Sequence, residues 1–351
     1  MYIIIAAIAF GLLIAVHELG HFIAAKLMDV RVLEFAIGLG PKILKKQGKE
    51  TLYSLRVFPF GGFCAMEEDE EARDPRSFSA KSRKRRVFIL AAGGVANFLA
   101  AFIITVIVVT QMSTFTGTTI AGFADGFPGR GENGLMPGDR IVSINGERLY
   151  YAQDFLMFMQ LERGSHVDLV IRRDGERIRL NSFPLEPREY LDDGVARVRY
   201  GIDFIGIENS VWEGFKYSCY MTINFVRLVR ISLAQLISGA VGVRDLTGPV
   251  GMVDMMNTVG QAAPTVTIAL ENIAHFVALI GVNIAVINLL PIPAMDGGRI
   301  FLLFVTWIIE KMTRRRVDPK YEGYIHQAAL VLLVCLMVFV LINDVARIVS
   351  G

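Results

Sequence analysis

Residues 3–28 read IIIAAIAFGLLIAVHELGHFIAAKLM, an apolar stretch with two histidines and a glutamate near its middle. At about 1.5 Å per residue, a helix of this length crosses the hydrocarbon core of a bilayer. No lysine or arginine precedes Lys26, so the stretch lacks the basic start of a cleaved signal peptide and we expect a retained span. Polar groups are costly in lipid, so the histidines and glutamate require a functional reason.

The composition favours a membrane protein with soluble inserts. Hydrophobic residues make up 53% of the 351 residues, and the mean hydropathy is +0.46. The net charge of +2 gives no indication of nucleic-acid binding. Cys64, Cys219 and Cys335 lie far apart, so they form neither a CxxC pair nor a disulfide framework.

Three more apolar segments are predicted to span the membrane, at residues 87–110, 273–290 and 326–342. The segment 215–241 differs, because Arg227 and Arg230 lie in its middle and share a helical face with Lys216 and Tyr220. Arginines are costly in hydrocarbon, so we expect an amphipathic helix at the membrane interface.

The positive charges of the loops predict the orientation. Residues 29–86 hold 13 lysines and arginines, and EKMTRRRVDPK (310–320) lies between the last two spans. Four spans with an extracytoplasmic N-terminus place both loops in the cytoplasm, whereas a fifth span at 215–241 would separate them. Residues 111–272 and both chain ends are therefore expected to be extracytoplasmic.

Two soluble patterns stand out between the spans. At about residues 115–203, short strands flank Asn145-Gly146 and Asp174-Gly175, pairs typical of type I′ turns, which predicts a small α+β domain. Residues 30–63 alternate like a β-hairpin. That hairpin is either soluble in the cytoplasm or dips among the helices, where protein or water can satisfy its backbone.

The motif His17-Glu18-Leu19-Gly20-His21 is an HExxH. On a helix its two imidazoles share a face and can bind one zinc, while Glu18 can take a proton from water. A catalytic zinc needs a third protein ligand. Asp296, in NLLPIPAMDGG (288–298), is expected at the depth of His17, whereas the other histidines lie at other depths: His166, His275 and His326.

Other polar or helix-breaking residues lie near this motif. Asn97, Asn283 and Asn288 fall inside spans and need partners there. They either form hydrogen bonds between helices or contact a substrate backbone or a developing oxyanion, and Asn288 is the better candidate on the third span. Pro291 and Pro293 free backbone groups beside Asp296, where a substrate strand can pair.

Over nearly its whole length the chain resembles the site-2 proteases, intramembrane zinc metalloproteases, in their bacterial RseP/RasP-type branch with one PDZ domain. HELGH (17–21) is similar to the family's HExxH, and NLLPIPAMDGG is similar to its NxxPxPxxDGG. Shorter similarities cover GLGP (38–41) and FPFGGF (58–63) of the re-entrant hairpin, GDRIVSINGERL (138–149) of the PDZ core, and TGPVG (247–251). The chain departs from the family at Met295, at GGVAN (93–97) and at GFPGRGENG (126–134).

The resemblance implies an enzyme that cleaves transmembrane segments in regulated intramembrane proteolysis, such as those of anti-sigma factors or remnant signal peptides. Zinc would be held by His17, His21 and Asp296, with Glu18 as general base. Substrate contacts would come from four positions: Asn97, Asn288, Pro291 and Pro293. The PDZ domain would bind a peptide or exclude substrates with large ectodomains.

We therefore expect a polytopic α-helical membrane protein with four transmembrane helices, a membrane-associated β-hairpin and an inserted α+β PDZ domain. The expected parts are 1–112 with HExxH and the hairpin, 113–205 as the PDZ domain, 206–265 as interfacial helix and connector, and 266–351 with the last two spans. The expected partners are single-span substrates, the lipid bilayer and a peptide of the PDZ domain, but no nucleic acid. The expected location is the bacterial inner membrane, with the active site towards the cytoplasm.

Two rival functions remain at this point. One is a membrane-anchored zinc protease that acts on soluble or misfolded proteins at the cytoplasmic face. The other is a membrane scaffold without catalysis, which leaves the cost of a buried Glu18 unexplained.

Overall fold

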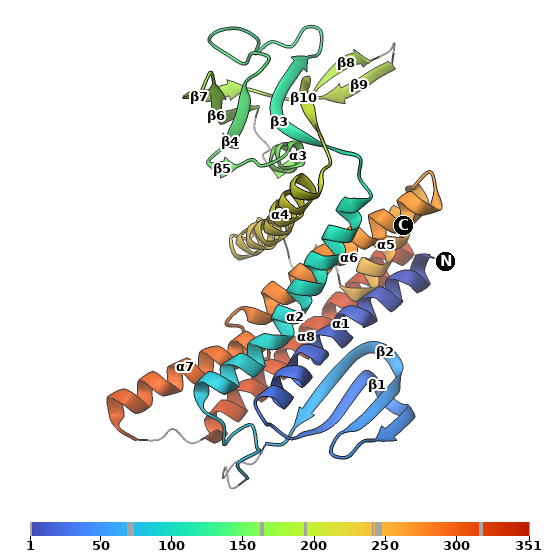
Figure 1. Ribbon diagram of the computed structural model, residues 1–351, viewed down its shortest axis with the longest axis vertical. Helices are drawn as coiled ribbons and strands as arrows, with labels where there is room; N and C mark the ends of the chain where they lie inside the picture. The colour runs from blue at the N-terminus through green and yellow to red at the C-terminus, as the bar shows by residue number, and fades with distance from the viewer. Residues whose placement is uncertain are drawn as a thin grey trace. The chain divides into compact units, whose positions relative to one another are not determined.

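The computed structural model describes residues 2–68, 74–161, 165–192, 195–240, 242, 248–315 and 319–350. The chain divides into two units, one formed by Met1–Val108 with Met221–Gly351 and the other by Val109–Tyr220. Figure 1 shows the elements of each. Each unit is described by itself below.

Four helices in the described part of the chain are long and apolar enough to cross a membrane. They are α1 (Tyr2–Leu27), α2 (Arg83–Thr110), α6 (Val266–Leu289) and the apolar part, Gly323–Asp344, of α8 (Pro319–Ser350). The sequence predicted these four segments. Helix α4 (Val211–Ile237), where an interfacial helix was expected, is not among them.

Small residues allow the spans of the first unit to approach closely. A Cβ on Gly20 of α1 would clash with the Ala92 carbonyl of α2 and lie 2.7 Å from the Ala96 side chain. A Cβ on Gly281 of α6 would lie 3.0 Å from Ala101 of α2. Such contacts are how helices pack in lipid, where dispersion replaces hydrophobic burial as the driving force.

Two further helices complete this unit. Helix α5 (Pro249–Ala262) packs on α1 and α6 around Met256, Ala6 and Ile273. Helix α7 (Asp296–Thr313) follows α6 after a short loop, and Leu303 joins a core with Ala25 of α1. The sequence predicted only a loop between the last two spans, so α7 corrects that expectation. In the expected TGPVG motif, Thr247 lies outside the described residues, and Gly248 precedes α5.

Strands β1 (Val32–Gln47) and β2 (Leu52–Met66) form an antiparallel two-stranded sheet with several register shifts. The shifts arise because residues 34–37 of β1 pair twice, with residues 52–55 and again with residues 62–65 of β2. Residues 44–47 of β1 also pair with residues 52–55. Residues 62–65 therefore form one margin of the sheet, and α1 packs against β2.

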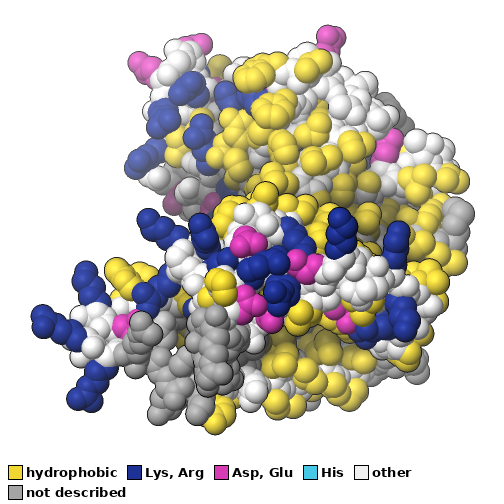
Figure 2. All heavy atoms as spheres, turned by 60° about the horizontal axis from the view of Figure 1, so that its bottom comes forward, with side chains coloured by type: hydrophobic (Ala, Val, Ile, Leu, Met, Phe, Trp, Pro, Cys, Tyr) yellow, Lys and Arg dark blue, Asp and Glu magenta, His cyan; other side chains and the backbone are white. Residues whose placement is uncertain are grey.

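The chain after this sheet ties the ends of several elements together. Phe78 is 2% exposed and packs in one core with α1, β1, α2 and α7. The guanidinium groups of Arg86 and Arg299 lie 5.1 and 5.4 Å from its ring centre. On the face that comes forward in Figure 2, lysine and arginine side chains gather among aspartates and glutamates.

In the second unit, one sheet has the order β10-β3-β4-β6-β7, with β5 beside β4. The strands are β3 (Thr114–Phe123), β4 (Arg140–Ile144), β5 (Glu147–Arg148), β6 (His166–Arg173), β7 (Glu176–Pro184) and β10 (Ile202–Glu208). Strands β8 (Arg188–Asp192) and β9 (Val195–Arg199) pair separately, and α3 (Ala152–Leu161) contributes buried Phe155 to the core.

The two predicted turns of this unit are confirmed. Asn145 and Gly146 have φ angles of 48° and 84° between β4 and β5, and Asp174 and Gly175 have 48° and 91° between β6 and β7. Both residues of a type I′ turn require positive φ, which asparagine, aspartate and glycine tolerate best. The local sequence therefore sets the register of both hairpins.

Candidate metal and catalytic site

Helix α1 brings the two histidines of HELGH to one face. His17 Nε2 and His21 Nε2 lie 3.2 Å apart. Residues four apart on a helix are one turn apart, so this approach follows from the spacing alone. The His21 side chain is 7% exposed and that of His17 is 12% exposed, so both nitrogens face the protein interior.

Asp296 reaches the same point from the first turn of α7. Its Oδ2 lies 3.2 Å from His17 Nε2 and 3.1 Å from His21 Nε2. Among the described residues, these three side chains form the group of ligand-type atoms in which all members lie within 4.8 Å of one another. Two segments 275 residues apart in sequence thus meet at one cluster.

The loop between α6 and α7 places Asp296 through a tight backbone path. Ala294 adopts a φ of 78°, which is strained for a residue with a side chain. A Cβ on Gly297 would clash with backbone of Leu290, and one on Gly298 would clash with the Ile292 carbonyl. The DGG motif therefore needs both glycines, because the loop folds directly onto the start of α7.

Neighbouring groups orient both imidazoles. His21 Nδ1 lies 2.9 Å from the Ile89 carbonyl of α2, so it donates there and leaves Nε2 with a lone pair towards the cluster. The Asn288 amide lies 3.5 Å from His17 Nδ1. With its amide oxygen turned to that nitrogen, Asn288 would orient His17 in the same way.

Gly93 of α2 lies directly against the two rings. A Cβ at this position would clash with His21 Nε2 and lie 2.7 Å from His17 Cε1. Gly94 next to it accommodates Leu289 of α6, whose Cγ would lie 2.9 Å from a Cβ. The sequence analysis missed Gly93 and the Ile89 carbonyl. The paired glycines inside an apolar span were the available signal for Gly93, whereas a backbone carbonyl leaves none.

Glu18 lies beside the margin of the β1–β2 sheet. A Cβ on Gly62 would lie 3.2 Å from Glu18 Cγ, and the backbone N–H of Cys64 donates to the Glu18 carboxylate. The sheet margin, Glu18 and the cluster of His17, His21 and Asp296 are therefore neighbours. A proton acceptor next to a metal-ligand set and a strand margin is an arrangement suited to peptide hydrolysis.

The other predicted residues lie outside this cluster. Asn97 is fully buried one turn beyond Gly93 on α2, and neither atom of its amide has a hydrogen-bond partner in the described part of the chain. Asn283 is half-buried on α6. Pro291 and Pro293 are exposed in the loop before Asp296.

The remaining histidines are not part of the cluster. His275 packs against the ring of Phe225, and His166 lies 2.9 Å from the hydroxyl of Ser165 in the second unit. The side chain of His326 lies outside the described residues. Asp296 thus stays the third ligand candidate among the described positions.

Ion pairs fix the end of α1 below the cluster. Glu50 accepts hydrogen bonds from Lys26 of α1 and from Arg76, at 2.7 and 2.8 Å. These two partners lower the pKa of Glu50 to about 2. In Glu34, burial alone would raise the pKa, but hydrogen bonds from Ser54, Arg56 and Lys42 outweigh it and lower the pKa to about 2.

The donor set fits zinc. Two imidazole nitrogens and one carboxylate oxygen are three of the ligand types that zinc prefers, and three protein ligands leave a fourth position for water or substrate. The bond from His21 to the Ile89 carbonyl is the outer support that such ligands usually have.

Comparison with known proteins agrees with this geometry. The profile of Peptidase family M50 matches residues 5–336. A protein of Clostridium acetobutylicum named as a zinc metalloprotease is 36% identical over 344 residues, covering 98% of this chain and 97% of its own. The regulator of sigma-W protease RasP of Bacillus subtilis is 25% identical over 423 residues, covering 97% of each chain. The chain therefore belongs to peptidase family M50, the site-2 protease family, and is a zinc metalloprotease.

Proposed function

We propose that this protease cleaves the transmembrane segments of single-span membrane proteins inside the membrane, as the second cut after an ectodomain has been removed. One observation carries the proposal: Asp296 meets the histidines of an HExxH that lies in the middle of a span-length apolar helix. Anti-sigma factors and remnant signal peptides are substrates of this type. The regulator role in the name of the Bacillus subtilis relative favours the former.

In this proposal His17, His21 and Asp296 hold the zinc. When bound, zinc supplies Lewis acidity, which activates water and polarises the scissile carbonyl. Glu18 accepts the proton of the attacking water and passes it to the leaving amine. The hydrogen bond from the Cys64 N–H holds the Glu18 carboxylate towards the sheet margin, where the substrate backbone would lie.

A helical substrate must unwind before its peptide bonds can be reached, because its backbone groups are paired within the helix. Residues 62–65 at the margin of the β1–β2 sheet support an added-strand mode, in which the unwound segment pairs beside Glu18. Part of this sheet would then dip into the membrane. Exposed apolar side chains on it, such as Leu39, Ile43 and Phe58, favour that placement.

The four predicted substrate contacts have different support. Asn97 is the best placed for a new partner, because its buried amide has no hydrogen bond in the described part of the chain. Pro291 and Pro293 are exposed next to Asp296, where they leave backbone carbonyls for a substrate. For Asn288, the contact with His17 favours an orienting role over the predicted substrate contact.

We also propose that the second unit is a PDZ domain outside the cytoplasm, with both chain ends on the same side. The support is its six-stranded sheet with α3 and the two I′ turns, together with the cytoplasmic bias of the basic loops. Such a domain would exclude substrates with intact ectodomains or bind a peptide. Cysteine labelling from either side of the membrane, at Ser113 and Arg314, would test the orientation.

The test of function uses purified protein in detergent and a single-span substrate without its ectodomain. Wild type, Glu18→Gln, Asp296→Asn and wild type with a zinc chelator are compared, and the cut is mapped by mass spectrometry. We expect a cut inside the span that is lost in the last three samples. A cut only in water-soluble test proteins would favour a cytoplasmic-face protease instead, and equal cutting by Glu18→Gln would overturn the catalytic assignment.

A further inference from the structure

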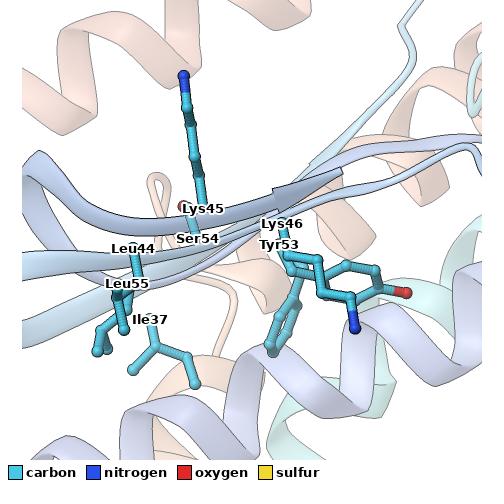
Figure 3. Close-up of a pocket in the computed structure, with 8 residues that line it drawn as sticks. Ile37, Leu44, Lys45, Lys46, Tyr53, Ser54 and Leu55 are labelled. Atoms are coloured by element: carbon cyan, nitrogen blue, oxygen red, sulfur yellow. The ribbon is translucent and has the colours of Figure 1, made fainter. Parts of the chain in front are cut away.

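One face of the β1–β2 sheet carries a hollow that the metal site does not use. Its volume is about 300 Å³, and it is lined mainly by Phe35, Ile37, Leu44, Tyr53 and Leu55. Figure 3 shows the labelled apolar side chains on one side of the sheet, together with Lys46, whereas Lys45 points to the other side. The hollow thus belongs to one face only.

The strand register explains why these side chains lie together. Gly62 pairs with Ile37, Ile37 pairs with Leu55, and Leu55 pairs with Leu44. Cross-strand partners share a face of the sheet, so these four residues form one row. With neighbouring strands about 4.8 Å apart, the row runs about 14 Å from Gly62 to Leu44.

A second row lies beside the first. Cys64 pairs with Phe35, Phe35 with Tyr53, and Tyr53 with Lys46. The ring of Phe22 on α1 supports this row, because its centre lies 5.2 Å from that of Phe35 and 6.0 Å from that of Tyr53. The two rows make an apolar trough with one wall fixed against α1.

The trough begins at the proposed general base. Glu18 Cγ lies over Gly62, the first residue of the first row, which has no side chain to block the way. The next residue in that row, Ile37, is one strand spacing further on, about 4.8 Å. A group bound at Glu18 is therefore within one side-chain length of the trough.

The chemistry of the trough suits an apolar occupant. Ile37, Leu55 and Leu44 are 37%, 42% and 63% exposed, although they are large and apolar. The opposite face of the sheet is polar, with Glu34 bound to Ser54 and Arg56. A volume of about 300 Å³ is at the low end for a ligand pocket, so it fits one or two side chains and not a whole small molecule.

We propose that this trough is a specificity subsite, which receives a large apolar side chain of the unwound substrate close to the scissile bond. The proposal rests on the proposed function. In a strand added at residues 62–65, every second side chain faces the same side as Gly62, so one of them lies at the mouth of the trough. Ile37 and Leu55 would then select leucine or phenylalanine over alanine at that substrate position.

A filling variant with a matched control tests the proposal. Leu55→Trp fills the middle of the trough, and Ile43→Trp adds the same bulk on the other face, at a residue that is 58% exposed. Each enzyme is given a single-span substrate in which the three residues on either side of the mapped cut are changed in turn to alanine, leucine or phenylalanine. The measured quantity is kcat/KM, in two detergent–lipid mixtures.

We expect Leu55→Trp to lower kcat/KM for leucine or phenylalanine at one substrate position by about 10-fold or more, and to leave the alanine substrate nearly unchanged. Ile43→Trp should keep the wild-type preference. An unchanged preference in Leu55→Trp, the same change in both variants, or a change that follows the lipid mixture instead of the substrate residue would overturn the subsite while the protease function stands. If the wild type cuts none of these substrates, the proposed function falls and the subsite with it.

A second measurement does not depend on cleavage. In the inactive Glu18→Gln protein, a photoreactive phenylalanine analogue is placed at Leu44 or at Ile43, and the substrate is added before irradiation. We expect a crosslink from position 44 and little from position 43. Equal crosslinking from both positions, or none from position 44, would contradict the subsite.

Discussion

The replacement Gly93→Ala should reduce zinc affinity without loosening the fold. Ordinary contact between a Cβ and a ring carbon begins at about 3.4 Å, but the new Cβ would lie 2.7 Å from His17 Cε1. The ring must therefore retreat by about 0.7 Å, and the clash with His21 Nε2 requires a larger movement. Metal–ligand distances tolerate only about 0.2 Å, so the three donors can no longer meet one ion well.

The expected loss is 10- to 100-fold in zinc affinity, on the order of what disturbed ligand orientation usually costs. The assay titrates purified protein with a chelator and measures bound zinc by mass spectrometry, alongside cleavage of the single-span substrate. Gly323→Ala on α8 is the matched control, because a Cβ there meets no atom within 4 Å. Alanine favours a helix over glycine by about 1 kcal/mol, so thermal stability should not fall from helix propensity in either variant. Unchanged zinc affinity in Gly93→Ala would refute the argument that this glycine makes room for the ligands.

Three further outcomes are expected. Glu18→Gln should lower kcat by about 10²- to 10⁴-fold while bound zinc, measured on the same sample, stays near the wild-type level. Asp344→Ala should lower the free energy of unfolding, because its buried carboxylate accepts from the backbone N–H groups of Gly248 and Gly251, and each unsatisfied amide costs about 1–3 kcal/mol; thermal unfolding in detergent checks this, with a smaller loss in Asp344→Asn. The pKa of Glu50 is lowered to about 2, so its contribution to stability is complete above about pH 4.5 and is lost as the pH falls towards 2; melting curves at pH 7 and pH 3 should differ less in Glu50→Gln than in wild type.

The apolar spans and the residues of the metal cluster could be predicted because strong local signals encode them. The position of each span follows from a run of apolar side chains, and the approach of His17 to His21 follows from helical spacing. Asp296 needed a further step, a comparison of depth along two helices that run in the same direction. The two I′ turns were readable because asparagine, aspartate and glycine have distinctive backbone preferences.

Other features had no such local signal. The double pairing of residues 34–37 depends on register shifts between distant segments, which alternation alone does not determine. Helix α7 was not expected because it follows two prolines and ends in a basic stretch that was interpreted as a loop. The roles of Gly93 and of the Ile89 carbonyl depend on the packing of α2 against α1, which becomes visible only when both helices are placed.

The separation of 275 residues between His21 and Asp296 has a consequence for biosynthesis. The ribosome delivers the histidines with the first span, and the aspartate follows only after the third span has been made. During most of its synthesis the nascent chain therefore holds two of the three donors, and it cannot assemble a complete zinc centre. A protease whose substrates are membrane helices is thus kept latent beside other newly inserted helices until most of its own chain has been translated.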